Sequence, residues 1–120
     1  MRICIDLDGT ICELRRDGQD YADVAPKPGA KEMIDALRRS GHTIIVHTAR
    51  NMETQGHNVG RVLRHVGKET LDWLERHGIA YDEIFFGKPN ADITIDDRVV
   101  RFEDWSLLSE EILLQSARPR

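Results

Sequence analysis

The sequence has no excess of positive charge and no long apolar run. Its 120 residues carry 17 Lys and Arg against 21 Asp and Glu, a net charge of −4. A general nucleic-acid binder needs a basic surface, so the net charge argues against this class. Apolar runs are about one strand long, far short of the roughly 20 residues that a membrane-spanning helix needs. The composition, 40% hydrophobic and 32% charged, predicts one soluble globular domain, residues 1–120.

Cysteine is scarce as well. Cys4 and Cys12 have no further partners at metal-ligand spacing, which excludes a cysteine-based metal site. An apolar stretch follows Arg2 directly, so we expect no signal or transit peptide. We therefore expect two reduced thiols in the cytoplasm, with Cys4 as a small core residue of the first strand.

Two carboxylates at the end of the first apolar stretch are the most informative feature. Residues 3–10 read ICIDLDGT, so Asp6 and Asp8 point to the same side of a strand. Carboxylates held this close repel each other, and a divalent cation relieves the repulsion. Gly9 allows a tight turn after them. The alternative is a plain Asp-Gly turn at a strand end.

Strand and helix patterns alternate along the chain. This alternation predicts right-handed βαβ units and therefore an α/β fold with a parallel sheet. The first strand is nearly continuous in apolar residues, which predicts burial on both faces. We expect strands at 2–7, 43–47, 83–86 and 93–95, a helix between Pro28 and Gly41, and helices at 58–66, 68–77 (with a break or kink near Gly67) and 104–116.

The connection 9–27 is long and polar. Connections of this length are usually functional or disordered, so it is either a lid over a site or a loose surface loop. The sequence leaves both interpretations open. The last residues, 118–120, are expected to fray.

Polar side chains follow the expected strands at or just past their ends. The carboxyl ends of parallel strands meet at one edge of a sheet, where ligands bind. Four carboxylates, a lysine and a threonine hydroxyl should therefore share one pocket, and this inventory suits Mg²⁺ plus a phosphate. These residues are Asp6, Asp8, Thr48, Lys88, Asp96 and Asp97.

Charge suggests a catalytic role for each group. Asp6 is the expected nucleophile that attacks phosphorus, and Asp8 protonates the leaving alkoxide and then activates water. Lys88 offsets charge on the phosphoryl group, and the Thr48 hydroxyl donates to it. Asp96–Asp97 complete the metal site, with the direct ligand left open. Each residue also has an ordinary alternative, as a turn cap, a surface lysine or a turn after a strand.

These residues, in this order, resemble the four motifs of the haloacid dehalogenase-like (HAD) superfamily. DLDGT at 6–10 resembles the first motif, Thr48 the second, Lys88 the third and Asp96–Asp97 the fourth. The resemblance implies a three-layer Rossmann-like sheet and Mg²⁺-dependent phosphoryl transfer through an aspartyl-phosphate on Asp6. It also implies that Mg²⁺ is bound by Asp6, by the backbone carbonyl of Asp8 and by a fourth-motif carboxylate.

A narrower resemblance is to the small capsule-biosynthesis phosphatases of this superfamily. It is carried by TARNM at 48–52, NVG at 58–60, YDEI at 81–84, GKP at 87–89 and IDDR at 95–98. It implies a sugar or polyol phosphate from a polysaccharide pathway as the small phosphorylated substrate. Candidates for substrate contact are then Gly9, Thr10, Arg50 and Asn51, although Arg50 and Asn51 are as well explained as loop residues before a helix.

The chain resembles members of this superfamily that have no cap domain. Only the 9–27 loop stands at one cap insertion point, and Lys88 follows the third strand too closely for the other. Capless members often complete the pocket with a neighbouring subunit, so a homo-oligomer is a candidate assembly.

Other functions remain open. A phosphorylation-dependent signalling receiver has similar length and residues, but it needs its phosphorylated aspartate after a mid-chain strand and its lysine late in the chain. Here the mid-chain strand ends in Thr48, and Lys88 precedes the pair Asp96–Asp97. A non-catalytic binding module on the same fold is a further alternative, and a nucleotide or phosphoprotein substrate stays open.

Overall fold

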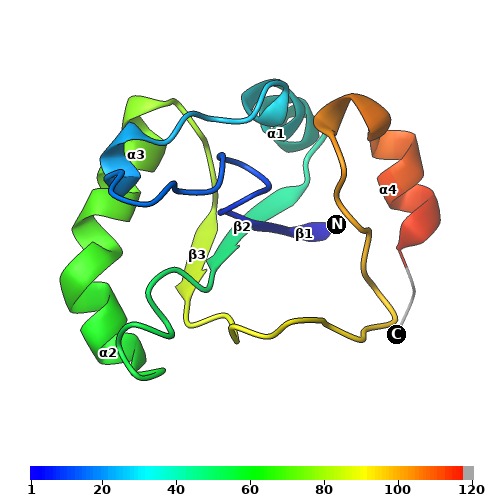
Figure 1. Cartoon of the computed structure of the whole chain (residues 1–120). Helices are drawn as coiled ribbons and strands as arrows, with labels where there is room; N and C mark the ends of the chain where they lie inside the picture. Colours follow the sequence, from blue (N-terminus) through cyan, green and yellow to red (C-terminus); the bar gives the residue numbers. More distant parts are fainter. Residues whose placement is uncertain (118–120) are drawn as a thin grey trace.

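Three parallel strands form the sheet of this computed structural model, which describes residues 1–117 (Figure 1). The tail at 118–120, for which the sequence predicts fraying, lies outside the described residues. The strand order is β1-β2-β3, with the pairs parallel, which confirms the predicted α/β architecture. The strands are β1 (Arg2–Asp6), β2 (Thr43–Thr48) and β3 (Glu83–Phe86).

Helices connect the strands and also follow the last strand. The helices are α1 (Ala30–Arg39), α2 (Val59–Val62), α3 (Lys68–Arg76) and α4 (Glu110–Ser116), with short 3₁₀ turns at η1 (Tyr21–Asp23) and η3 (Trp105–Leu107). The π-helical segment η2 (Leu63–Gly67) joins α2 to α3. Gly67 has helical dihedrals, φ −60° and ψ −55°, so the predicted break there is a π-helical turn inside one continuous run.

The main core lies between one face of the sheet and helices α1 and α3. Ile34 of α1 and Trp73 of α3 belong to the same buried cluster as Ile44 and Val46 of β2. Both βαβ connections step in the same direction along the sheet, and right-handed crossovers therefore place α1 and α3 on the same face.

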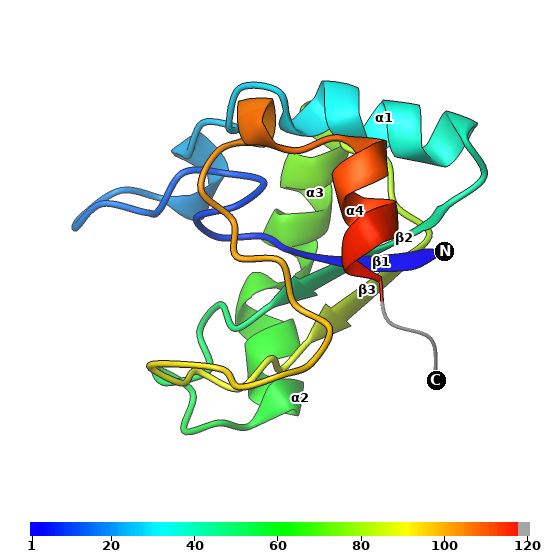
Figure 2. The ribbon, with the colours of Figure 1, turned by 90° about the vertical axis from the view of Figure 1, so that its right-hand side faces the viewer.

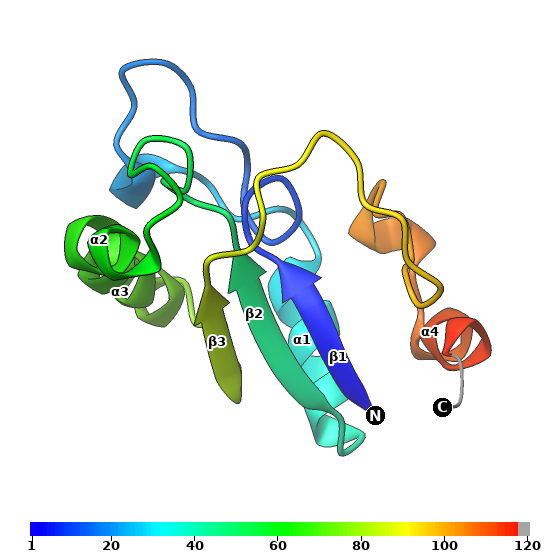
Figure 3. The ribbon, with the colours of Figure 1, turned by 90° about the horizontal axis from the view of Figure 1, so that it is seen from below.

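The opposite face of the sheet is open, contrary to the predicted burial of β1 on both sides. Cys4 is exposed and not a core residue, and Phe85 on the same face is 54% exposed. No described helix covers this face, because α4 stands beside the sheet, beyond β1 (Figures 1 and 3). The three-layer arrangement expected from the resemblance is therefore incomplete in the part of the chain that the structure describes.

The predicted fourth strand is wrong in this structure. Residues 93–95 have no regular structure, and Ile93 and Ile95 are 76% and 96% exposed. Their alternating pattern has strand character, but a strand needs a paired neighbour, and none of residues 1–117 pairs with them. The expected helix 104–116 is also interrupted: η3 ends before Ser109, whose side chain caps α4 by accepting a hydrogen bond from the Ile112 amide at 3.2 Å.

The base of the 9–27 loop is held by backbone hydrogen bonds. The Glu13 amide donates to the Ala25 carbonyl at 2.9 Å, and the Lys27 amide donates to the Ile11 carbonyl at 2.8 Å. The loop is therefore ordered at its base, and its closure over a site stays a prediction. Figure 2 shows this loop, in blue, projecting beyond the carboxyl ends of the strands, as the yellow segment after β3 also does. Within residues 1–117, no helix is both long and apolar enough to span a membrane.

The core packing on α3 gives a direct test. Leu74 is fully buried, whereas Leu71 on the same helix is exposed. We expect Leu74→Ala to lower the free energy of unfolding by about 2–5 kcal/mol, since it removes buried methyl groups and leaves a cavity. Leu71→Ala is the matched control and should cost less than about 1 kcal/mol. Urea unfolding followed by circular dichroism measures both, and equal losses would contradict this account of the core.

Candidate active site

The structure brings four of the predicted site residues together at the carboxyl ends of the strands. Asp6 ends β1 and Thr48 ends β2, while Asp8 and Lys88 each follow a strand end by two residues. Lys88 Nζ lies 3.3 Å from Asp6 Oδ1. Thr48 Oγ1 donates to Asp8 Oδ2 at 3.1 Å. Residues from three separate parts of the chain thus meet here, as the parallel topology requires.

Asp6 and Lys88 form a partly exposed ion pair. The side chains of Asp6 and Lys88 are 31% and 30% exposed, so solvent still reaches both groups. Partial burial raises the pKa of Asp6 above its usual value, and the ammonium of Lys88 opposes that rise. Asp6 is therefore a carboxylate whose charge depends on the lysine beside it.

Asp8 is held by the guanidinium of Arg50. Arg50 Nη2 donates to Asp8 Oδ1 at 2.7 Å, and Arg50 Nε donates to both carboxylate oxygens at 3.3 Å. The Arg50 side chain is fully buried. The Thr48 hydroxyl that donates to Asp8 also accepts a hydrogen bond from the Arg50 amide at 3.0 Å. Asp8 is consequently oriented by two nitrogens of Arg50 and by the Thr48 hydroxyl, and the Cys12 thiol adds a weaker donor at 3.7 Å.

The guanidinium of Arg50 also links the site to the loop and to α3. Its Nη1 donates to Thr70 Oγ1 at 3.1 Å, and its Cζ lies 3.9 Å from the centre of the Tyr21 ring. A guanidinium over an aromatic face is a favourable cation–π contact. Arg50 Nη2 lies 3.8 Å from the buried Cys12 sulfur, and burial raises the pKa of that thiol to about 12. Cys12 is therefore a protonated packing group with little reactivity at neutral pH.

The four predicted substrate-contact residues have different surroundings. Gly9 has φ +85°, a conformation that glycine adopts without strain, and its amide donates to the Cys12 carbonyl. The Thr10 carbonyl accepts from the indole nitrogen of Trp105 at 2.7 Å. Asn51 has φ +61° and is half-buried. The guanidinium of Arg50 is turned inward to Asp8, so the structure does not present it to a substrate.

Asp96 and Asp97 are not brought to the other carboxylates. Both are exposed, and Asp96 Oδ1 accepts a hydrogen bond from the nearby Arg98 amide at 2.9 Å. Among residues 1–117, no group of three or more His, Cys, Asp and Glu side chains is placed to hold a metal ion. The predicted set of four carboxylates is therefore not assembled in this conformation, because the strand that would carry Asp96 and Asp97 to the site is not formed.

Two carboxylates alone are still a reasonable donor set for Mg²⁺. This ion commonly takes one or two protein carboxylates, keeps several waters and binds substrate phosphate. Asp6 is accessible for this role, whereas the Asp8 carboxylate is engaged by Arg50 and Thr48. Of the two carboxylates, Asp6 is therefore the one better placed to bind Mg²⁺.

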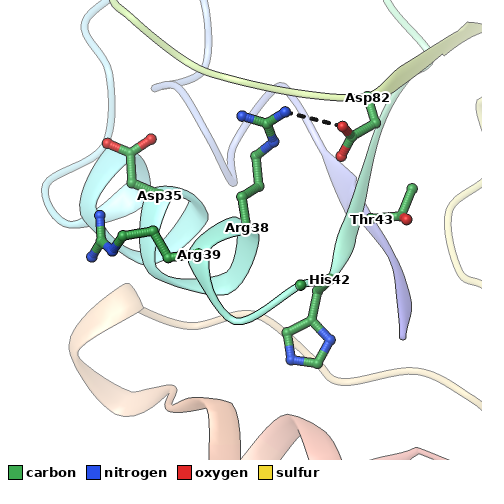
Figure 4. Close-up of a pocket in the computed structure, with 7 residues that line it drawn as sticks. Asp35, Arg38, Arg39, His42, Thr43 and Asp82 are labelled. Atoms are coloured by element: carbon green, nitrogen blue, oxygen red, sulfur yellow. Dashed lines mark hydrogen bonds and ion pairs between the residues drawn. The ribbon is translucent and has the colours of Figure 1, made fainter.

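Two surface hollows flank the sheet. One, of about 370 Å³, lies on the open face beside Lys88 and includes Cys4, Ile45, His47 and Phe85 in its lining. The other, of about 520 Å³, lies at the amino ends of β2 and β3 and is shown in Figure 4. Its charged groups partly neutralise each other, since Arg38 pairs with Asp82 at 3.0 Å. The second hollow is remote from Asp6 and Asp8, because it lies at the amino ends of the strands and these two residues lie at the carboxyl ends.

The sequence interpretation missed Tyr21 and Thr70 as parts of the site. Thr70 stands four residues after Val66 and three before Trp73, both buried, so helical spacing places it on the buried side of the helix. A polar residue on a buried stripe needs a partner, and this signal was available in the sequence. Tyr21 gave a weaker signal, as one aromatic side chain in a polar loop.

The fold and the site define an α/β protein with an Asp-Lys pair and an Asp-Arg pair at the carboxyl ends of a parallel sheet. No protein-family model and no curated protein matches the chain. A crystal structure of an MCSG target from Vibrio cholerae is similar, with 34% sequence identity and a TM-score of 0.83. The match covers 96% of this chain and 94% of that one. The chain belongs to the same family as that Vibrio cholerae protein.

The ion pair at Asp6 predicts how its pKa responds to substitution. In Lys88→Met we expect the pKa of Asp6 to rise further, because the cation that favours the carboxylate is lost while the burial remains. An NMR titration of the carboxyl carbon measures this. The matched control is Lys68→Met, which removes an exposed lysine paired with Asp72 and should leave Asp6 unchanged. An unchanged or lower pKa of Asp6 in Lys88→Met would contradict the pairing.

The buried guanidinium predicts a large stability effect. Arg50→Met should lower the free energy of unfolding by about 3 kcal/mol, since it leaves the Asp8 carboxylate without its main partner. Adding Asp8→Asn should recover about 1 kcal/mol or more, since it removes the unpaired charge. Arg76→Met, at an exposed arginine, is the control and should cost less than about 1 kcal/mol. Additive effects in the double-mutant cycle would show that Arg50 and Asp8 do not interact.

Proposed function

We propose that the chain is a Mg²⁺-dependent, HAD-like phosphatase that hydrolyses a small phosphomonoester through an aspartyl-phosphate on Asp6. The observation that carries this proposal is the placement of Asp6 and Lys88, 3.3 Å apart and partly exposed at the carboxyl ends of the strands. A carboxylate can attack phosphorus only where its negative charge is offset. Lys88 supplies part of that offset, and Mg²⁺, when bound, would reduce the repulsion further.

In the first step, Asp6 Oδ would attack phosphorus while the bond from phosphorus to the leaving oxygen breaks. The leaving alkoxide needs a proton, which the carboxyl group of Asp8 would supply. In the second step, water attacks the phosphorus of the aspartyl-phosphate, Asp8 takes the proton of that water, and Asp6 and inorganic phosphate are released. The contacts of Asp8 with Arg50 and Thr48 would hold this group in one position through both proton transfers.

Arg50 would then act on the reaction through Asp8. The buried guanidinium of Arg50 binds both oxygens of the Asp8 carboxylate. The guanidinium is itself held by a hydrogen bond to Thr70 and by the ring of Tyr21. We therefore regard Arg50 as a positioning residue for Asp8, and not as the substrate contact that the sequence suggested. The Thr48 hydroxyl shares this task, since it lies between the Arg50 amide and Asp8.

For the substrate we propose a sugar or polyol phosphate, on the resemblance to the capsule-biosynthesis phosphatases. The open hollow beside Lys88 supports a leaving group larger than an alcohol of a few atoms, because its approximate volume is 370 Å³. An exposed free thiol at Cys4 is in keeping with a reducing compartment, so we propose that the protein acts in the cytoplasm.

Phosphate release from a panel of sugar, polyol and nucleotide phosphates tests the proposal. We expect release with Mg²⁺, none with chelator, and a loss of at least about 1000-fold in Asp6→Asn, which keeps the side-chain shape but removes the nucleophile. Glu83→Gln, at a partly exposed carboxylate that pairs with Arg2 at the amino end of β3, is a control that should stay active. Release that persists in Asp6→Asn would overturn the assigned nucleophile. Mg²⁺ binding without turnover of any substrate would favour a binding module.

A further inference from the structure

Three side chains on the open face of the sheet form one row across the strands. Asp6 of β1 is the register partner of His47 in β2, and His47 is the register partner of Phe85 in β3. Register partners in neighbouring parallel strands point to the same side of the sheet. Figure 3 shows the three strands side by side, with β2 in the middle. The imidazole of His47 and the ring of Phe85 therefore lie on the side to which Asp6 points.

The row borders the hollow of about 370 Å³ on the open face. His47, Phe85 and Lys88 all belong to its lining. The Lys88 ammonium is 3.3 Å from Asp6 Oδ1, so the hollow begins directly beside the carboxylate. A phosphate ester attacked by Asp6 would therefore hold its leaving group beside this hollow.

The lining suits a ring that has an apolar face and several hydroxyls. Phe85 is 54% exposed, and the negatively polarised face of an aromatic ring attracts the C–H groups on the apolar face of a sugar. His47 is half-buried, and a neutral imidazole offers one donor and one acceptor to hydroxyl groups. Cys4 and Ile45 make the rest of this floor apolar. A mainly apolar hollow with few polar groups is the usual form of a small-molecule site.

The width of the row limits the occupant to one ring. β1 and β3 are two strand spacings apart, which is about 10 Å. A ring in van der Waals contact with a group on each of its sides needs about 3.5–4.0 Å on each side. One ring therefore fits between the Asp6 carboxylate and the Phe85 ring, above His47. A ribose followed by a base does not fit between them.

We propose that His47 and Phe85 bind the leaving group and select a phosphate ester of a single sugar ring over open-chain polyol phosphates and over nucleotides. Phe85 stacks on the apolar face of the ring, and His47 forms a hydrogen bond with one of its hydroxyls. An open-chain polyol has no such face, and it loses the freedom of several rotatable bonds on binding. This inference rests on the proposed phosphatase function and narrows its substrate class.

Matched pairs of substrates test the selection of a ring. Glucose, mannose and galactose 6-phosphates each differ from the corresponding hexitol 6-phosphate by two hydrogens, and only the hexose closes into a ring. We expect kcat/KM of the wild type to be at least about 10-fold higher for the best hexose than for its hexitol. Phe85→Leu should raise KM for that hexose about 3–10-fold and leave kcat and the hexitol values nearly unchanged, since only stacking is lost. Leu71→Ala, at an exposed leucine of α3, is the control and should change neither constant.

The hydrogen bond of His47 has its own test. His47→Leu should raise KM for the best hexose 6-phosphate about 3–10-fold. For the monodeoxy analogue that lacks the bonded hydroxyl, the same substitution should cause no further loss, because the bond is already absent. An equal loss with every monodeoxy analogue would show that His47 does not contact the sugar, and this overturns its role.

Binding without turnover reads the subsite independently of catalysis. In Asp6→Asn with Mg²⁺, ¹⁹F NMR of protein labelled with 4-fluorophenylalanine reports on the three phenylalanines of the chain. The signal of Phe85 is the one that Phe85→Leu removes. We expect the hexose 6-phosphates to shift this signal and the hexitol 6-phosphates at the same concentration to leave it in place.

The outcomes separate this inference from the phosphatase proposal. A hexose 6-phosphate that shifts the Phe85 signal in a protein that releases no phosphate supports the subsite and overturns the phosphatase function alone. Phosphate release that is equal for ring and open chain, fastest with nucleotides, or unchanged by Phe85→Leu overturns the subsite and leaves the phosphatase function standing. A Phe85 signal that no hexose 6-phosphate shifts overturns the subsite as well.

Discussion

The buried guanidinium of Arg50 is the interaction on which the candidate site depends. It binds the Asp8 carboxylate after β1, stands just past the end of β2, contacts Thr70 of α3 and lies against Tyr21 of the 9–27 loop. A buried cation is costly unless its donors are satisfied, and here several elements satisfy them together. The loop, the helix and two strand ends are therefore held in one arrangement by a single side chain.

The site balances its charges in two pairs. Lys88 faces Asp6, and Arg50 faces Asp8, so these four groups have no net charge. A phosphate group carries a charge of about −1.5 to −2 at neutral pH, and a site with no net charge would bind this group weakly. The two pairs differ in exposure, because solvent reaches Asp6 and Lys88 while the Arg50 side chain is buried. This difference suits the proposed roles, in which Asp6 is a nucleophile that solvent and substrate reach and Asp8 is an acid–base group that Arg50 holds in position.

Much of the fold and about half of the site could be read from the sequence. The ICID stretch, the helix ending near Gly41 and the strand at 83–86 carry strong local patterns, and the structure has β1, α1 and β3 there. Parallel topology then brings Asp6, Asp8, Thr48 and Lys88 together without further information. The fourth strand failed because ITID has strand character but pairing depends on a neighbour, which a local pattern does not specify.

The sequence by itself determined the order of β1, β2 and β3 and of the helices between them, and it placed polar groups at the ends of these strands. Periodicity is a local property, and a helix between two strands makes the strands parallel. Only the tertiary structure decided that Arg50 turns inward to Asp8, that Cys4 is exposed, and that Asp96 and Asp97 stay apart from Asp6. These outcomes depend on which elements cover a given face or edge. Burial and ion pairing are set by contacts between residues distant in the chain, and those contacts exist only once the elements have packed.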